Sequence, residues 1–202
     1  MNNRRPRGRP RGETGSKDAI LAVARRRFLA DGYDRVTLRS IAAEAGVDAA
    51  LVSYHFGSKR GLFGAALQLP ANPPQIVAAL LEGPMNTLPE RLPRAVLAAW
   101  DDPARAVALR GFAQAVLFDP EFGRLFREMA EREMVARIAE RLGGADASRR
   151  ASVAASQVAG MIFARYVLRL EPLASMPADE LVARMAPALR AALADPRQSE
   201  RW

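Results

Sequence analysis

Residues 37–59, with the sequence TLRSIAAEAGVDAALVSYHFGSK, constrain the fold more than any other stretch of this chain. The first half places apolar residues at the i, i+3, i+4 and i+7 spacing of one helix face, as Leu38, Ile41, Ala42 and Ala45. Thr37 stands at the N-cap position of this helix, and Gly46 follows its last turn, where a left-handed backbone favours glycine. Asp48 then provides the cap of a second helix. The stretch therefore predicts two short helices joined by a tight turn.

A further helix is predicted immediately before this pair. In residues 16–31, Ile20, Ala24 and Phe28 fall at i, i+4 and i+8, and Gly32 closes the helix. We expect this apolar face to pack on residues of the following pair, namely Ile41, Val52 and Phe56. Two helices around a glycine turn form a helix-turn-helix, whose second helix enters the major groove of DNA. A helical hairpin with a purely structural role is the alternative interpretation.

Residues 17–69 resemble the DNA-binding domain of the TetR family of bacterial transcriptional regulators. The residues that carry the resemblance are Ala24, Phe28, Gly32, Tyr33, Thr37, Ile41, Ala42, Ala45, Gly46, Val47, Tyr54, His55, Phe56, Lys59 and Leu62. The resemblance implies an all-α protein of about nine to ten helices. An N-terminal three-helix DNA-binding domain would precede a C-terminal helical body for ligand binding and dimerisation. Two positions depart from the family pattern: Leu51-Val52-Ser53 stands where Thr-Leu-Tyr is common, and Arg60 stands where Glu is common.

Composition favours an all-α fold and narrows the chemistry. Ala, Leu and Arg, which are good helix formers, are abundant, and β-branched runs are scarce. The chain has no cysteine and a single histidine, His55, so disulfides, thiolate metal sites and His-based catalytic or zinc sites lack their residues. We therefore predict no metal, no cofactor and no enzymatic activity. A carboxylate enzyme using Glu128, Glu131 and Glu133 is an alternative, although arginines flank these residues and no histidine supports a di-iron site.

Positive charge is concentrated in the first third of the chain. Residues 1–72 contain 13 Lys+Arg against 6 Asp+Glu, whereas residues 73–202 contain 17 against 16, so the net charges are +7 and +1. A basic module indicates a polyanionic partner, although a solvated basic face gives the same count. We predict a basic arm over 1–13, a DNA-binding domain over 14–72 and a helical body over 73–202, with a Pro-rich break between the last two. In the body, helices are predicted over 74–82, 89–101, 103–118, 120–142, 146–170 and 178–194.

The basic arm carries Arg9 and Arg11 in a segment rich in Pro and Gly. The run Arg7-Gly8-Arg9-Pro10 resembles the core of an AT-hook, which would place arginine in a narrow minor groove. A loose tail that adds only non-specific attraction explains the same composition. Both interpretations predict that the arm contributes to DNA binding.

The predicted contacts to DNA surround the helix-turn-helix. The resemblance places Thr37 and Arg39 near the DNA backbone, and Lys59, at the start of a helix predicted over 58–69, is the best candidate for a phosphate contact. His55 either packs among its apolar neighbours or touches a phosphate. The second helix of the motif is the predicted recognition helix. The residues expected to contact base edges or phosphates there are Asp48, Ala49, Ala50, Leu51, Ser53 and Tyr54. Because Ala and Leu offer only apolar contact, such as with a thymine methyl, specificity is expected to lean also on DNA shape and on the arm.

Two sets of residues in the body are functional candidates. Large apolar residues with a few polar groups predict a pocket for a small, mostly apolar effector, formed by Trp100, Arg110, Phe112, Gln114, Phe118, Gln157, Met161 and Phe163. In the final two helices, small residues and an apolar stripe predict a surface for another helix, formed by Ser156, Gly160, Leu181, Met185 and Leu189. An ordinary helical core explains both sets. The resemblance implies an effector pocket and a four-helix bundle that joins two subunits.

These features predict a DNA-binding transcriptional regulator that binds a palindromic operator as a homodimer. Repression relieved by an effector is the predicted mode, and activation stays open. A low-specificity architectural DNA-binding protein that uses the Arg-rich arm is the alternative. The N-terminus has no apolar stretch behind its arginines, and the charge-free run 151–164 is shorter than the ~20 residues that span a bilayer. We therefore expect a cytoplasmic location and no membrane partner.

Overall fold

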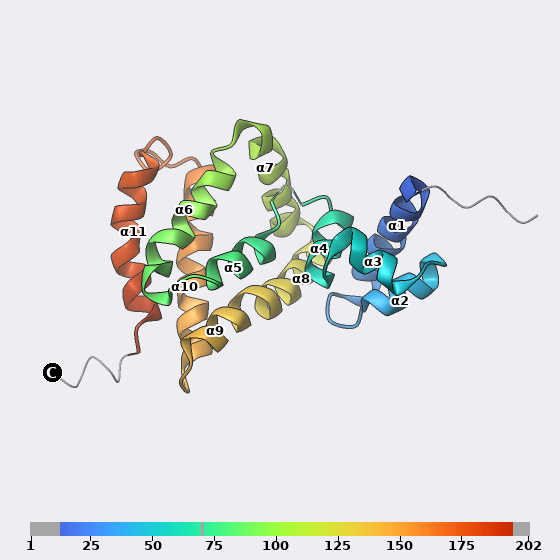
Figure 1. Cartoon of the computed structure of the whole chain (residues 1–202). Coiled ribbons are helices and arrows are strands. Elements are labelled where there is room, and N and C mark those ends of the chain that lie inside the picture. The colour runs from blue at the N-terminus through green and yellow to red at the C-terminus, as the bar shows by residue number, and fades with distance from the viewer. Residues whose placement is uncertain (1–12, 70, 196–202) are drawn as a thin grey trace, which may run out of the picture. The chain divides into compact units, whose positions relative to one another are not determined.

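The computed structural model describes residues 13–69 and 71–195 of the 202-residue chain (Figure 1). All regular secondary structure in this part of the chain is helical, which confirms the predicted all-α fold. Contacts between residues divide the chain into two units after Leu67. The boundary predicted after residue 72 lies close to this division. A lipid bilayer could not be spanned by any helix within the described residues.

The first unit contains the helix-turn-helix and its supporting helices, namely α1 (Glu13–Asp31), α2 (Leu38–Ala45), α3 (Ala49–Phe56) and α4 (Lys59–Ala66). The side chains predicted to cap α2 and α3 do so. Thr37 Oγ1 accepts a hydrogen bond from the Ser40 N–H at 3.0 Å, and Asp48 Oδ1 accepts one from the Ala50 N–H at 2.6 Å. Gly46 ends α2 in the left-handed conformation, with φ of 67°. Local sequence signals therefore determine where both helices of the motif begin and where α2 ends.

The core of the first unit extends beyond the predicted contact between α1 and the helix pair. All predicted core members are buried: Ile20, Ala24, Phe28, Ile41, Val52 and Phe56. α4 adds Phe63, and the loop between α1 and α2 adds Tyr33. The rings of Phe28, Tyr33 and Phe63 lie 5.1 to 5.9 Å apart, centroid to centroid, with Phe63 edge-on to the other two. Because burial of one such ring contributes roughly 1.5–3 kcal/mol, this cluster binds α4 firmly to α1.

The second unit is a bundle of longer helices. Its elements are α5 (Pro73–Leu81), a 3₁₀ turn (Met85–Thr87), α6 (Leu88–Trp100), α7 (Pro103–Phe118), α8 (Pro120–Ala130), a π-helical segment (Glu131–Val135), α9 (Ala136–Leu142), α10 (Ala147–Ile162), a second π-helical segment (Phe163–Val167) and α11 (Ala178–Leu193). The six helices predicted for this unit are all present. The predicted helix over 120–142 is interrupted by the first π-helical segment, and the one over 146–170 ends in the second. Such wide turns leave no periodicity in the sequence that would reveal them.

The main core of the second unit lies between its long helices. In Figure 1, α11 runs beside α6 and α10, and residue contacts join it to both. The buried members of this core are Val77, Leu88, Leu92, Ile138, Ala139, Ala147, Ala151, Ala154, Val158, Leu189 and Leu193. Several alanines of α10 are among them, and small side chains let neighbouring helices approach closely. The alanine-rich composition is therefore used for close helix packing.

Arg150 is a buried arginine that joins three parts of the second unit. Its side chain is 8% exposed, and its Nε donates a hydrogen bond to Asp146 Oδ1 at 2.9 Å. Nη1 donates to the carbonyl of Leu193 at 2.9 Å, and Nη2 donates to the carbonyl of Gly143. These two carbonyls lie at the C-terminal ends of α11 and α9, where the helix itself supplies no partner. The guanidinium therefore ties the end of α11 to the turn between α9 and α10.

Replacing Arg150 with Met is expected to lower the free energy of unfolding by about 2–4 kcal/mol, because both helix-end carbonyls lose their donor inside the protein. The measurement is urea unfolding followed by circular dichroism. The control is Arg149→Met at the exposed neighbouring position, which should change stability by less than about 0.5 kcal/mol. Equal effects of the two substitutions would contradict a stabilising role for Arg150.

Candidate nucleic-acid interface

α3 is fixed by two buried residues and presents its other side chains outward. Val52 is fully buried and Phe56 is 9% exposed, so this side of α3 belongs to the core. Ala50, Ser53 and Tyr54 are exposed, and Tyr54 has 79% of its surface accessible. Ala49 and Leu51 are half-buried. Of the predicted base-contacting residues, Ala50, Ser53 and Tyr54 therefore lie on the solvent side of one short helix, as a recognition helix requires.

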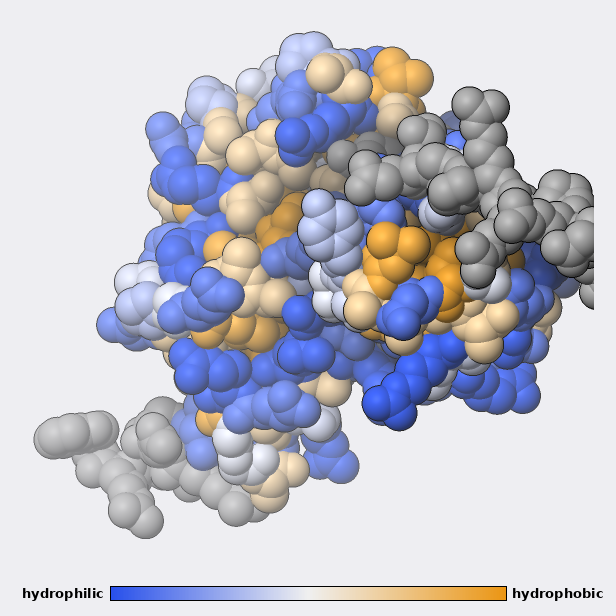
Figure 2. Space-filling model, turned by 45° about the vertical axis from the view of Figure 1, so that its right-hand side comes forward, coloured by the Kyte–Doolittle hydropathy of each residue, from blue (hydrophilic) through white to orange (hydrophobic). Residues whose placement is uncertain are grey.

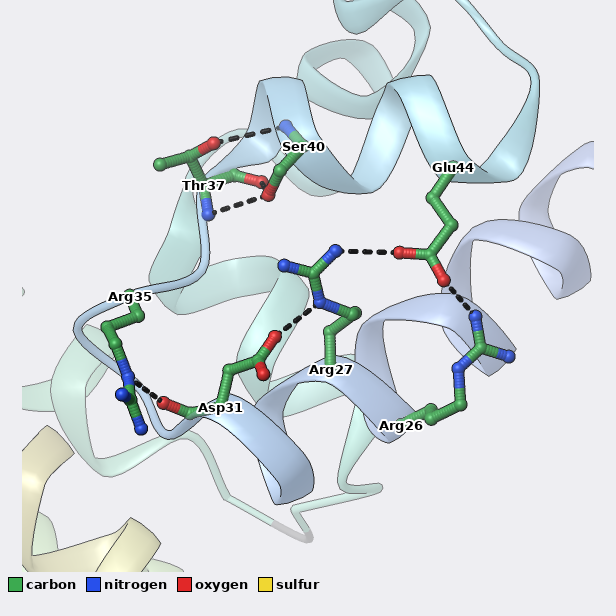
Figure 3. A network of polar contacts seen from close by, with 7 residues as sticks. All are labelled: Arg26, Arg27, Asp31, Arg35, Thr37, Ser40 and Glu44. Atoms are coloured by element: carbon green, nitrogen blue, oxygen red, sulfur yellow. Dashed lines mark hydrogen bonds and ion pairs between the residues drawn. The ribbon is translucent and has the colours of Figure 1, made fainter.

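The N-terminus of α2 is the second part of the interface. Thr37 and Ser40 form a reciprocal capping box, in which each side-chain oxygen accepts from the other residue's backbone N–H (Figure 3). The cap uses a lone pair of the Thr37 oxygen, so the hydroxyl hydrogen can be donated to a phosphate. Thr37 and Arg39 are both exposed. Together with the positive end of the helix dipole, these groups make the start of α2 suitable for an anion.

A network of ion pairs holds α2 against α1 (Figure 3). Glu44 of α2 accepts hydrogen bonds from Arg26 Nη2 and, at 2.8 Å, from Arg27 Nη1, both on α1. Arg27 Nε also donates to the carboxylate of Asp31, and Arg35 Nε donates to the Asp31 carbonyl at 2.8 Å. The hydrogen bonds from Arg27 and then Arg26 lower the pKa of the Glu44 carboxyl. The hydrogen bonds that Arg27 donates to Glu44 and then to Asp31 raise the pKa of Arg27. Two of the three consecutive arginines of α1 therefore position the motif.

Lys59 connects the start of α4 to the loop before α2. Its Nζ donates to the carbonyl of Asp34 at 3.2 Å and lies 4.3 Å from the centroid of the Tyr33 ring. The half-buried side chain thus has an intramolecular role, and its contact with phosphate stays a prediction. His55 is half-buried, and its ring lies 5.3 Å from that of Tyr54 and 5.9 Å from that of Phe56, centroid to centroid. This placement favours its packing role. Arg9 and Arg11 lie outside the described residues.

The residues predicted to line an effector pocket do not all face one interior. Trp100 and Met161 are buried, while Phe112 and Gln157 are half-buried. The remaining four are exposed: Arg110, Gln114, Phe118 and Phe163. Phe118 has 80% of its surface accessible, so it lines no interior of this protomer. Hydrophobic residues reach the surface in patches between hydrophilic ones in the view of Figure 2.

Trp100 is a predicted pocket residue, but its partners in an aromatic and polar cluster, among them Asp101 and Tyr166, were not among the predicted residues. The Trp100 ring stacks on that of Tyr166 at 4.9 Å, and the Tyr166 hydroxyl donates to Asp101 Oδ1 at 2.8 Å. Burial, and then the hydrogen bond to Asp101, raise the pKa of Tyr166 above its usual range, so it stays a neutral donor. Arg165 Nη1 donates to the carbonyls of Leu173 and Met176 at 2.6 and 2.8 Å. No spacing rule joins positions 100 and 166, which are far apart in the sequence.

The carboxylates considered for an enzyme are held by arginines of the same helical stretch. Glu128 Oε1 accepts from Arg124 Nη1 at 2.7 Å, and Glu133 Oε2 accepts from Arg137 Nε at 3.0 Å. Glu131 is exposed. Over the described ranges, no group of three or more His, Cys, Asp or Glu residues is placed to hold a metal ion. The geometry therefore gives the carboxylate-enzyme alternative no support.

Two family models match the sequence. Residues 20–66 match bacterial regulatory proteins of the tetR family, and residues 86–193 match the tetracyclin repressor-like C-terminal domain. The chain belongs to the TetR family. Its resemblance to that family in residues 17–69 is thereby confirmed, and the second match extends it to the helical body. The chain is thus a DNA-binding transcriptional regulator with a helix-turn-helix domain and a C-terminal helical domain.

Several solved structures are similar to this TetR-family protein. A TetR-family regulator from Streptomyces coelicolor A3 is 35% identical over 94% of this chain and 100% of that one, with a TM-score of 0.48. EbrR, a multidrug binding protein complexed with proflavin, is 25% identical over 88% and 99% of the two chains, with a TM-score of 0.48. NalD, the secondary repressor of the MexAB-OprM multidrug efflux pump in Pseudomonas aeruginosa, is 19% identical over 90% and 97%, with a TM-score of 0.42. No curated protein matches the sequence.

The residues predicted to form a dimer interface, on the final two helices, fall into a buried group and an exposed group. Leu181 and Leu189 are buried and Met185 is partly buried, all against the core of their own protomer. Ser156 and Gly160 are exposed on α10, and a Cβ added at Gly160 would meet nothing within 4 Å. The apolar stripe of α11 therefore serves intramolecular packing, whereas the small residues of α10 lie on an open surface.

Replacing Glu44 with Gln is expected to remove a stabilising contribution that depends on pH. Because the folded-state pKa of Glu44 is lowered from 4.5, its ion pairs stabilise the fold above that value and lose their effect as the pH falls below it. The urea midpoint of the wild type should therefore exceed that of Glu44→Gln at pH 7, and the difference should disappear in acid and shrink in high salt. Asp18→Asn, at an exposed position of α1, is the control. A difference that persisted unchanged at low pH would contradict the ion-pair interpretation.

Replacing Lys59 with Ala is expected to weaken binding to specific and random duplexes by the same factor. The slope of log K against log salt concentration should fall by ~1, because one phosphate contact is lost. The measurement is fluorescence anisotropy of labelled duplexes over a salt series. Lys59→Arg, which keeps the charge, should retain the slope. An unchanged slope in Lys59→Ala would leave Lys59 with only its contacts to Asp34 and Tyr33.

Proposed function

We propose that this TetR-family regulator is a repressor that binds a palindromic operator as a homodimer and is released by a small-molecule effector. The presentation of α3 carries the proposal. Val52 and Phe56 anchor the helix in the core, while Ala50, Ser53 and Tyr54 remain on its solvent side. A short helix held in this way fits the major groove, and the capped start of α2 suits a neighbouring phosphate.

The proposed dimer forms through the exposed faces of the last two helices. On α10, the exposed residues at i, i+3 and i+7 are Val153, Ser156 and Gly160, and Phe163 is exposed at the start of the π-helical segment that follows. On α11, the exposed residues include several small ones, Ala183, Pro187, Ala188 and Ala191. Two such surfaces allow helices of two subunits to pack closely in a four-helix bundle. Two-fold symmetry then presents two copies of α3, which doubles the DNA contacts and requires a palindromic operator.

The proposed effector site lies near the Trp100 cluster. Trp100 and Leu109 are buried there, with Ile76, Ala113 and Tyr166 packed against them. These side chains suit a small, mostly apolar molecule with an aromatic group. Gln157 is a second candidate for contact, because its buried Oε1 has no hydrogen-bond partner in the described part of the chain. An amide at that position could fix the orientation of a polar ligand group.

Release follows from linkage. The effector relieves repression only by the difference between its affinities for the DNA-binding arrangement and for another arrangement of the dimer. The proposed regulator acts in the cytoplasm, where its operator is, and its role requires no catalytic group or cofactor. A low-specificity architectural DNA-binding protein is the competing function, which the net charge of +7 in residues 1–72 would support.

Selection from a random duplex pool tests the proposal against the architectural alternative. Duplexes bound by the protein are amplified and sequenced, and the enriched duplex then competes with random duplex at roughly 50 and 200 mM salt. We expect a palindromic sequence and a preference of at least ~10³ over random duplex. A preference near unity with a steep salt dependence would favour the architectural function instead.

Sedimentation and operator binding of a Gly160→Glu variant test the proposed dimer. The new side chain meets open space in the protomer, so the fold should persist, but a charge would stand in the proposed interface. We expect a monomer in sedimentation experiments and operator binding weakened by at least ~100-fold, because the second half-site no longer adds to the first. Ser148→Glu, also exposed on α10, is the matched control and should remain dimeric. A dimeric Gly160→Glu protein would place the interface elsewhere.

A further inference from the structure

α3 lacks the side chains that read guanine and adenine with paired hydrogen bonds. Its residues, AALVSYHF, include no Arg, Lys, Asn, Gln or Glu. These are the side chains that recognise guanine, adenine and cytosine in the major groove. Ser53 and Tyr54 each offer one hydroxyl, which can donate to or accept from several bases or a phosphate. Hydrogen bonds from α3 therefore leave most base pairs poorly distinguished.

Asp48 does not fill this gap. Its Oδ1 accepts from the Ala50 N–H at 2.6 Å and forms the N-cap of α3. The cap uses one of the two carboxylate oxygens and holds the group beside the first turn, and its negative charge opposes the approach of phosphates. The groups left at the N-terminal end of α3, where recognition helices reach base edges, are the apolar side chains of Ala49, Ala50 and Leu51.

We propose that α3 selects its operator chiefly through the C5-methyl groups of thymine, with Ala50 and Leu51 as the contacting side chains. The thymine methyl is the single apolar group that the four bases expose in the major groove. Ala50 is exposed, and Leu51 is half-buried beside it, so both combine an apolar surface with a fixed position. Packing of Val52 at 0% exposure fixes the rotation of α3, which determines the positions of its neighbours. This inference rests on the proposed placement of α3 in the major groove.

Recognition of the thymine methyl group also predicts how cytosine methylation changes binding. 5-Methylcytosine carries its methyl at the same ring position as thymine. An apolar side chain that contacts this methyl can therefore contact it in either base. A cytosine in place of a contacted thymine should therefore bind poorly, and its methylation should restore part of the affinity. A reader that uses hydrogen bonds to thymine O4 would show no such recovery, because cytosine presents a donor at that position.

The test removes methyl groups from the DNA and side chains from the protein in one cycle. The duplex enriched from a random pool is prepared with thymidine, with deoxyuridine at single thymine positions, and with cytosine or 5-methylcytosine there. Binding of the full-length protein is measured by anisotropy. Loss of a contacted methyl should weaken binding about fourfold, and about 15-fold when the same contact is lost in both half-sites.

Variants assign the contact to α3. In Leu51→Ala and Ala50→Gly, the ratio of affinities for thymidine and deoxyuridine duplexes should fall towards one at the position that each residue contacts. Ser53→Ala, an exposed neighbour on the same helix, should keep the wild-type ratio. Because each ratio compares two duplexes with one folded protein, a change in stability does not alter its meaning.

Three outcomes would count against the inference, and they are distinct. Equal affinity for thymidine and deoxyuridine duplexes, with a specific operator present, would overturn methyl reading and leave the regulator intact. A methyl effect that is unchanged in Leu51→Ala and in Ala50→Gly would assign the contact to another part of the chain. Failure to enrich any duplex would instead refute the proposed function on which the inference rests.

Discussion

α3 has eight residues, and a helix of this length is not stable in water on its own. Its conformation depends on burying Val52 and Phe56 in the core formed with α1, α2 and α4. Asp48 caps its beginning, and Gly57, with φ of 68°, ends it. The two buried positions fix which side of the helix is left for DNA. The interface is therefore a consequence of the packing of the first unit, and its residues cannot be rotated independently of that core.

Charged side chains in the second unit are used to complete its backbone hydrogen bonding. Among the described residues, the buried charged side chains are Glu133, Arg150 and Arg165. Arg150 donates to carbonyls at the ends of α9 and α11, and Arg165 donates to carbonyls of the connection before α11. The several donors of one planar guanidinium group suit such sites, where the ends of helices meet and their carbonyls have no partner within the helix. Arginines of the second unit, whose net charge is close to zero, thus have structural roles that its net charge does not reveal.

The sequence predicts what depends on neighbours along the chain. The caps at Thr37 and Asp48 and the left-handed Gly46 are local features, and each was found as expected. Contacts between distant positions were not predictable, because periodicity reports a face and not its partner. Glu44 with its two arginines and the Trp100–Tyr166 stack are examples. For the same reason, the stripe of Leu181 and Leu189 gave no sign of whether its own protomer or another would cover it, and the structure places it in the core.

Affinity and specificity come from different parts of the proposed regulator. The net charge of +7 in residues 1–72 attracts any duplex, while α3 contributes no arginine or lysine. If α3 contacts thymine methyls as proposed, what it adds is modest for one half-site, since a methyl contact contributes about 0.8 kcal/mol and a bidentate hydrogen-bonded pair about 1–3 kcal/mol. A palindrome multiplies that small advantage only when both copies of α3 meet grooves about 34–36 Å apart. In the proposed mechanism, an effector that changes this spacing would remove the second contribution without altering α3 itself. A recognition helix that contributes little binding free energy is therefore released from DNA more easily than one that contributes much, because less binding free energy opposes the effector.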